Sequence, residues 1–300
     1  MADDGVSIMP NAGRSSSVVE LDEALAVVQD GATVGIGGAI TAGHPMALVR
    51  ALARRGVRDL TVVAPVAGME VDLLIAAGCV KRVVGCYVGT EVVSAVGPIF
   101  RRAVEEGRVE VVDLDEAHCV VGLRAAGHRL PFMPWRGGVG TSFPQLNPTL
   151  VEFDDPIRGE PLLAIPAIEL DVALIYAEVS DAYGNAQAVG TAHMDVLLGS
   201  AAKDVVIQVD RVVTTEEIRR NPDRTMFWAG ASVVHAPFGT HPSSNGWMTA
   251  DEQHLRDFAA AAKAGEEAIA EYLRINVHEP ADHAAYLEAV GIRRITSLLV

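Results

Sequence analysis

The residues best placed to do chemistry are three carboxylates at the end of a predicted strand over residues 108–114. Asp113, Asp115 and Glu116 stand where this strand ends and a predicted helix over residues 116–129 begins. Ligands of open α/β sheets bind at the carboxyl ends of parallel strands, so these acids are candidates for general acid–base chemistry. Asp115 also suits a helix N-cap, and Glu116 complements the helix dipole. Position alone favours this structural interpretation.

A second candidate is the glycine-rich turn Val34-Gly35-Ile36-Gly37-Gly38 at the end of a predicted strand. Adjacent glycines let a ligand approach the backbone closely and offer their N–H groups to it. A dinucleotide fingerprint would need glycine where Ile40 stands, and the chain contains no GxxxxGK[ST] phosphate loop. The turn is therefore either a ligand-binding turn of another kind or merely a tight turn.

Other catalytic patterns find little support in the sequence. No GxSxG segment occurs, so a Ser–His–Asp nucleophile elbow is not predicted. The nine histidines include no HxxxH pair, and Cys79, Cys86 and Cys119 form no CxxC pattern. We expect no metal site, and three reduced thiols. The turn at residues 181–185 is more typical of structure than of catalysis.

The composition excludes several classes of protein. Of the 300 residues, 50% are hydrophobic but only 5% aromatic, so aliphatic side chains must build the core. Lys and Arg number 24 against 39 Asp and Glu, and the resulting net charge of −15 argues against a nucleic-acid surface. No apolar run reaches the ~18 residues of a membrane span, and the first residues do not resemble a signal peptide. We expect a cytoplasmic protein without nucleic-acid or membrane partners.

The elements that must position these residues alternate along the chain. Apolar periodicity and glycine caps predict helices over 21–30, 46–55, 71–77, 98–106 and 116–129, separated by strands over 32–36, 59–63, 80–88 and 108–114. Strands alternating with short helices imply right-handed crossovers. The predicted fold class is α/β, with an open, mostly parallel sheet covered by helices on both faces.

The second half of the chain begins with a segment of different character. Residues 130–162 contain six prolines and few apolar runs, which predicts a long loop that carries function or an interface. Further strands are predicted over 171–177, 205–209 and 231–235, with a long amphipathic helix over 251–273. We expect a flexible N-terminus over 1–20, one domain over 21–275 and a C-terminal extension over 276–300.

Several segments in this order resemble the α (A) subunit of family I coenzyme A transferases, which include glutaconate and 3-oxoacid CoA-transferases. The resemblance runs from about residue 21 to about residue 273. Among the segments that carry it are DGATVGIGG (30–38), PMALVRAL (45–52), LPFMPWR (130–136), GTS (140–142) and VHAPFG (234–239).

The resemblance implies a two-chain enzyme with coenzyme A as substrate and no permanently bound cofactor. A glutamate of the β (B) subunit would attack the acyl-CoA carbonyl, giving a mixed anhydride and then a glutamyl-CoA thioester. The present chain lacks the β-type Glu-Asn-Gly segment, because its only Asn-Gly, Asn245-Gly246, follows Ser244. We therefore expect it to form one wall of the site in a heterodimer or heterotetramer.

Particular residues acquire roles from the same resemblance. Gly37 and Gly38 are similar to a glycine-rich turn that lines the acyl-CoA pocket. The expected contacts to coenzyme A also include Arg136, Gly140 and Thr141. Because coenzyme A carries phosphates, Arg136 is the best basic donor in this chain.

Glu116, with Asp115, matches the position of an active-site carboxylate on the α subunit of a related two-chain hydrolase that opens a steroid-derived ring. That hydrolase carries basic residues before the proline matching Pro45, whereas residues 39–44 (AITAGH) include no Arg or Lys. A CoA thioester is therefore a firmer expectation than a steroid ring.

Three functions follow for testing. The first is the α subunit of a CoA-transferase that moves coenzyme A between carboxylic acids. The second is an acyl-CoA thioester hydrolase or ring-opening hydrolase with Glu116 as general base. The third is a non-catalytic metabolite-sensing subunit, which would call for an attached DNA-binding segment that the short, acidic residues 1–20 do not provide.

Overall fold

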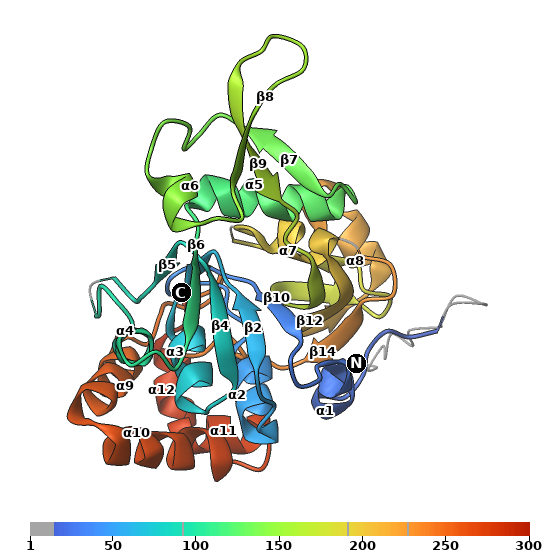
Figure 1. Ribbon diagram of the computed structural model, residues 1–300. Helices are drawn as coiled ribbons and strands as arrows, with labels where there is room; N and C mark the ends of the chain where they lie inside the picture. Colours follow the sequence, from blue (N-terminus) through green and yellow to red (C-terminus); the bar gives the residue numbers. More distant parts are fainter. Residues whose placement is uncertain (1–14, 92, 191, 227) are drawn as a thin grey trace.

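The computed structural model describes residues 15–91, 93–190, 192–226 and 228–300. Its main sheet contains seven parallel strands, with neighbours in the order β6, β4, β2, β1, β10, β12 and β14 (Figure 1). Their bounds are Glu110–Asp113, Val80–Gly85, Leu60–Val63, Thr33–Ile36, Leu170–Asp181, Ala202–Val213 and Ser232–His235. Two short strands, β11 (Ala186–Gln187) and β13 (Thr225–Met226), extend it antiparallel. The predicted α/β class with an open, mostly parallel sheet is confirmed.

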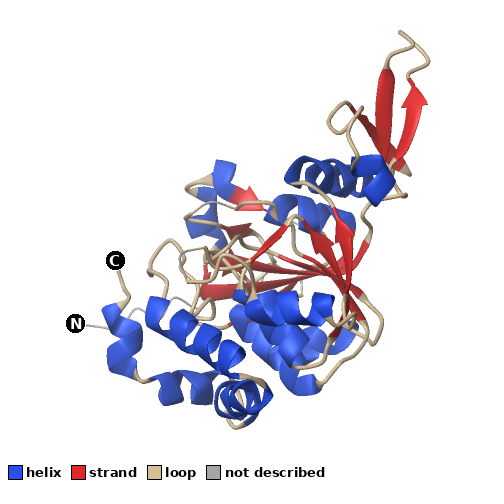
Figure 2. Cartoon of the chain, turned by 60° about the vertical axis from the view of Figure 1, so that its left-hand side comes forward, coloured by secondary structure: helices blue, strands red, loops and turns tan. Residues whose placement is uncertain are grey.

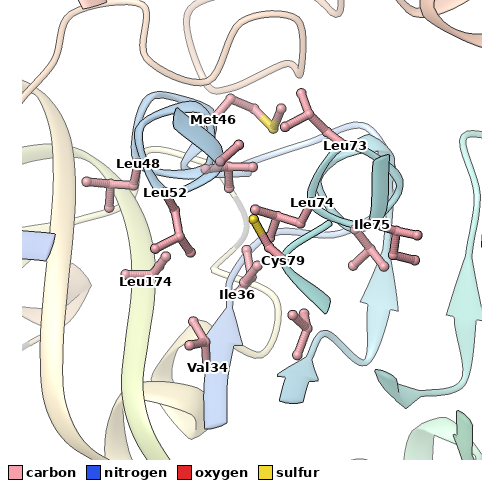
Figure 3. Close-up of a cluster of buried hydrophobic side chains, with 14 of the residues drawn as sticks. Val34, Ile36, Met46, Leu48, Leu52, Leu73, Leu74, Ile75, Cys79 and Leu174 are labelled. Atoms are coloured by element: carbon pink, nitrogen blue, oxygen red, sulfur yellow. The ribbon is translucent and has the colours of Figure 1, made fainter. Parts of the chain in front are cut away.

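Helices cover both faces of this sheet because its strands are apolar on both sides. Val34 and Ile36 of β1, with Val172 and Leu174 of β10, belong to one core cluster, whereas Ala173 belongs to the other. The first cluster packs under α2 (Met46–Arg55), α3 (Met69–Ala76), α4 (Pro98–Glu105), α9 (Glu252–Ala264) and α10 (Glu266–Leu273). Figure 3 shows the side chains of α2 and α3 meeting those of β1. The second packs under α5 (Glu116–Gly127) and α7 (Asp195–Ala201).

Most predicted elements of the first half are present, with ends shifted by at most three residues. The helix predicted over 46–55 has the bounds of α2, and that over 116–129 corresponds to α5. The helix predicted over 21–30 is shorter, because α1 (Leu21–Ala24) passes into a 3₁₀ turn, Leu25–Val27. The helix predicted over 251–273 is two helices, since Gly265 with φ of 120° ends α9 and precedes α10.

The segment predicted as a loop over 130–162 forms a sheet of its own, so that prediction was wrong. Strands β7 (Phe132–Trp135), β8 (Val151–Asp154) and β9 (Pro161–Pro166) are antiparallel in the order β7-β9-β8, and a short helix α6 (Phe143–Leu146) lies between β7 and β8. The prolines do not prevent pairing, because Pro134 lies on an edge strand and Pro161 begins β9. We call residues 132–166 the arm; Figures 1 and 2 show its sheet standing out from the body beyond α5.

The two ends of the chain lie against the body where they are described. Residues 1–14 of the predicted flexible N-terminus lie outside the described residues, whereas Val18 pairs with Val233. Beyond residue 275, α11 (His283–Val290) and α12 (Ile292–Ser297) follow a π-helical turn. The Arg50 guanidinium of α2 lies 3.6 Å from the centre of the Tyr286 ring of α11. Within the described part of the chain, no helix is long and apolar enough to cross a membrane.

Candidate active site

The glycine turn after β1 is built against the start of α7. Gly38 N–H donates to Asp195 Oδ1 at 2.9 Å, and Gly37 N–H donates to the Leu174 carbonyl at 2.9 Å. A Cβ on Gly37 would lie 2.1 Å from Asp195 Oδ1, and Gly38 has φ of 91°, so both positions require glycine. Both N–H groups already have acceptors within the chain, and the space beside both glycines is filled by Asp195 and by the backbone of Ala42 and Gly43, so the turn holds these groups in place rather than presenting free donors.

A cavity of about 250 Å³ lies beside this turn, at the carboxyl end of β10. Glu178 faces it with both carboxylate oxygens held, since Oε2 accepts the Val189 N–H at 2.7 Å and Oε1 the Gly246 N–H at 2.9 Å. The other lining residues are Ala42, Gly43, Tyr176, Ala188, Gly190, His193, Asp195, Ser244 and Asn245. The cavity is therefore polar, with its acids placed by backbone N–H groups.

Burial changes the protonation of two acids at this edge of the sheet. It raises the pKa of Asp195 to about 8 and that of Asp210, at the end of β12, to about 6. Asp210 Oδ2 accepts the Tyr176 hydroxyl at 2.5 Å and the Asn245 amide at 3.1 Å. At pH 7 Asp195 is mostly protonated, so it presents a neutral acid rather than a charge to an anionic ligand.

Asp115 and Glu116 lie farther along the same edge and differ in what they do. Asp115 Oδ1 accepts the backbone N–H of His118 at 2.7 Å and caps α5, as the structural interpretation expects. Glu116 is exposed, and its carboxylate makes no hydrogen bond or ion pair within the described residues. Of the two candidates, Glu116 is the one whose carboxylate is available for chemistry.

The glycine turn and Glu116 belong to one edge of the main sheet. Strands β1, β2, β4 and β6 are neighbours, so the ends of β1 and β6 are about 14 Å apart. Between them, the Cys86 thiol donates to the Pro65 carbonyl at 2.8 Å. Burial and then the charge of Glu116 raise the pKa of this thiol, so Glu116 is close enough to act on Cys86 through its charge. Gly37, Gly38 and Glu116 are thus brought to the same edge without direct contact.

The loop that holds Gly140 and Thr141 packs on the first turn of α5 through His118. The buried His118 ring has Nε2 3.1 Å from the Gly137 carbonyl and Nδ1 3.1 Å from Asp115 Oδ1. Thr141 Oγ1 donates to the Gly138 carbonyl at 2.7 Å, and Gly140 has φ of 73°. The structure therefore gathers this loop and Asp115 around one histidine.

Arg136 points elsewhere. Its exposed guanidinium forms an ion pair with Glu160 of the arm. It also lines an open cavity of about 660 Å³ formed by the arm, together with Trp135 and Arg158. Arg136 is therefore set apart from the glycine turn, and part of its charge is already balanced.

A group of side chains of the kinds that bind metals lies around the start of α9. His241, Asp251 and His254 are buried, with ligand atoms within 4.8 Å of one another. Each side chain already has partners: Asp251 binds Arg294 at 2.5 and 2.7 Å, and the rings of His241 and His254 meet the hydroxyls of Tyr286 and Tyr272 at 2.8 and 2.6 Å. The donor set is therefore used in a hydrogen-bond network that fastens α11 and α12 to the body.

Sequence reasoning missed Asp195, Glu178 and Asp210. Glu178 and Asp210 follow the buried strands predicted over 171–177 and 205–209, the same position that drew attention to Asp113. That signal was therefore available in the sequence. Asp195 opens a short helix and meets its partner across 157 residues, so no local pattern marks it.

Comparison with known proteins agrees with this architecture. A family model described as coenzyme A transferase matches residues 18–227. The cholesterol ring-cleaving hydrolase IpdA subunit of Mycobacterium tuberculosis is 37% identical over 259 residues, which cover 81% of this chain and 87% of that protein. The chain also spans 63% of an uncharacterized protein of Archaeoglobus fulgidus, at 33% identity over 283 residues.

The A subunit of glutaconate CoA-transferase from Acidaminococcus fermentans is 30% identical over 305 residues, which cover 95% of each chain. The crystal structure of glutaconate coenzyme A-transferase from that organism superposes with a TM-score of 0.89 at 29% identity. The superposition covers 95% of this chain and 96% of the other. The family model, the relatives and the fold agree, and the chain belongs to the coenzyme A transferase family, among its α (A) subunits.

Proposed function

We propose that this chain is the α (A) subunit of a two-chain enzyme that moves coenzyme A between carboxylic acids. The reaction begins when a glutamate of the B subunit, acting as nucleophile, adds to the thioester carbonyl and expels the CoA thiolate, leaving a mixed anhydride. The thiolate then attacks the glutamyl carbonyl and releases the first acid, and the second acid reverses these steps. Every carboxylate and thiolate is regenerated, so the exchange needs no further reactant.

The observation that carries this proposal is the cavity beside Gly37 and Gly38. Both substrates of such an exchange carry a carboxylate, which an ionised acidic wall would repel. The neutral Asp195 and the backbone-bound Glu178 give the cavity a polar wall in which one acid can donate a hydrogen bond. The Gly37-Gly38 turn holds Asp195 at this edge, where the partner's glutamate would act.

The decisive experiment is turnover by the assembled enzyme. The chain is co-expressed with the B-subunit candidate of the same genome and given glutaconyl-CoA with and without acetate. The donor is suggested by the name of the glutaconate CoA-transferase relative and the acceptor by that of an acetate CoA-transferase relative. Transfer predicts acetyl-CoA only when acetate is present, and borohydride or hydroxylamine should trap a glutamyl thioester on the B subunit. CoA release that needs no acceptor, with no trapped thioester, would refute transfer.

A second candidate function is hydrolysis, and the exposed, unpaired Glu116 favours it. In this mechanism Glu116 takes a proton from a water molecule as that water attacks its target. The target is either the thioester carbonyl of an acyl-CoA or a ring within its acyl group. Mass spectrometry separates the cases: thioester hydrolysis releases coenzyme A without an acceptor, and ring opening adds one water to the intact thioester. A sensing subunit would bind acyl-CoA and turn over neither substrate with its partner present.

A further inference from the structure

The sheet of the arm has two faces with different surroundings. Cross-strand pairing places Met133 beside Ile165 and Trp135 beside Leu163 on the face toward α5. Leu163 and Ile165 are fully buried there, in the cluster that includes residues of α5. This inner face explains why the arm folds onto the body.

The outer face of the arm is apolar at every position. In register across three strands it carries Phe132, Pro134, Val151, Phe153, Leu162, Ala164 and Pro166. None of these side chains is buried, and Phe132 and Val151 are 42% and 58% exposed. An antiparallel sheet whose second face meets water normally alternates apolar and polar residues. A continuous apolar outer face is therefore typical of an interaction surface.

The hairpin loop between β8 and β9 turns this face into a hollow. The Asp155 carboxylate accepts the backbone N–H groups of Ile157, Arg158 and Glu160 at 2.9 to 3.1 Å, which fixes the loop. Ile157 at its tip is 89% exposed. The resulting cavity of about 660 Å³ has apolar walls, with Arg136 and Arg158 among its lining residues. Arg158 has no ion pair within the described residues, so a carboxylate would complement it.

The area of the outer face and the net charge of the chain indicate what kind of partner covers this hollow. A face of three strands spans about 300 Å². Two copies stacked face to face would bury about 600 Å² in total, half of what the smallest stable interfaces need. A second copy would also add another net charge of −15. The occupant must therefore be a different chain that covers more than the arm.

We propose that the outer face of the arm docks the B subunit, which presents apolar side chains flanked by a carboxylate that pairs with Arg158. This inference rests on the proposed function for the existence of that partner. The arm is carried by α5, whose first turn lies at the edge where the B subunit would supply its glutamate. One partner can therefore span both the edge and the arm, which supplies the missing area.

The test measures affinity between the purified chain and the B-subunit candidate. The double variant Val151→Glu, Ile157→Glu places charge on the outer face at exposed positions. Ile292→Glu is the matched control, since Ile292 is 70% exposed on α12. We expect the double variant to raise Kd at least about 30-fold, Arg158→Glu to raise it about 10-fold, and the control to stay within about 3-fold. Circular dichroism and melting curves verify that the variants fold.

Four results would overturn the inference. The first is unchanged affinity in the folded double variant, and the second is no binding of the B-subunit candidate by the wild-type chain. The third is a wild-type homodimer that the double variant dissociates. The fourth is quenching of tryptophan fluorescence by coenzyme A that Trp135→Phe abolishes. The last two assign the hollow to a second copy or to a nucleotide. A complex that assembles through the arm but turns over no acyl-CoA refutes the proposed function and leaves this inference standing.

Discussion

Asp195 accepts a hydrogen bond from the backbone of Gly38 at 2.9 Å, although 157 positions separate the two residues. The bond ties the first residue of α7 to the turn after β1, so the shape of the glycine turn depends on a distant part of the chain. The same carboxyl group leaves no room for a side chain on Gly37. Asp195 is thus a positioning residue for the candidate site.

Gly37→Ala should lower the free energy of unfolding by about 1–3 kcal/mol, because its methyl group would overlap the Asp195 carboxylate. Gly190→Ala is the control, since its new methyl would lie 3.8 Å from the nearest atom. Thermal and urea unfolding measure both. Adding Asp195→Ala to Gly37→Ala should cost less than the sum of the single changes. Strict additivity would show that the two residues do not compete for space.

Asp195→Asn should flatten the decline of stability with rising pH between about pH 4 and pH 8. The folded chain keeps the Asp195 proton up to about pH 8, whereas the unfolded chain loses it near the ordinary value of 3.8. Its stability contribution is therefore full below the unfolded pKa and declines as pH rises through about 8. Melting temperatures across this range measure the slope. Burial also raises the pKa of Asp72, to about 7, so the variant should keep part of the dependence of stability on pH. An unchanged dependence would contradict the expectation that Asp195 holds a proton in the folded chain.

Under the hydrolytic candidate function, in which Glu116 is the general base, Glu116→Gln should lower kcat of the assembled enzyme about 100-fold or more. Folding and assembly should stay intact, since the carboxylate supports no contact in the described structure. Glu105→Gln, which changes an exposed acid at the end of α4 outside the candidate site, serves as the control and should retain activity. Steady-state kinetics and size-exclusion chromatography read the two effects separately. Wild-type turnover by Glu116→Gln would leave this residue with only its helix-dipole role.

Asp115→Ala should destabilise the chain by about 1 kcal/mol, because it removes the N-cap of α5. Asp115→Asn keeps an oxygen acceptor and should cost much less. Chemical unfolding of the two variants measures the difference. An equal loss in both variants would mean that the charge of Asp115, rather than its cap, stabilises the helix.

Acid should weaken the contacts of the C-terminal helices. Burial lowers the pKa of His241 to about 4 and that of His254 to about 3. The unfolded chain takes up these protons near pH 6.5, so stability is full above that value and falls as pH drops toward 4. A loss of about 3 kcal/mol is expected from the shift of His241 and about 5 kcal/mol from that of His254. His254→Asn should reduce this acid slope, and the exposed His128→Asn should not.

The sequence allowed much of the scaffold to be predicted because its signals are local. Apolar periodicity with a C-terminal glycine located α2, and apolar runs located the central strands. The arm was missed because six prolines were taken as a loop, although prolines at strand edges and starts leave the ladder intact. The hydrogen bond between Asp195 and Gly38 left no local trace, because tertiary packing alone brings the two residues together.

Helix α5 connects Glu116 to the arm through one continuous element. About 18 Å long, it holds Glu116 at one end and carries the arm along its flank. A partner bound to the arm would therefore contact a segment that packs on the same helix that positions Glu116. If the B subunit docks on the arm as proposed, its binding and the orientation of Glu116 would be coupled through one helix.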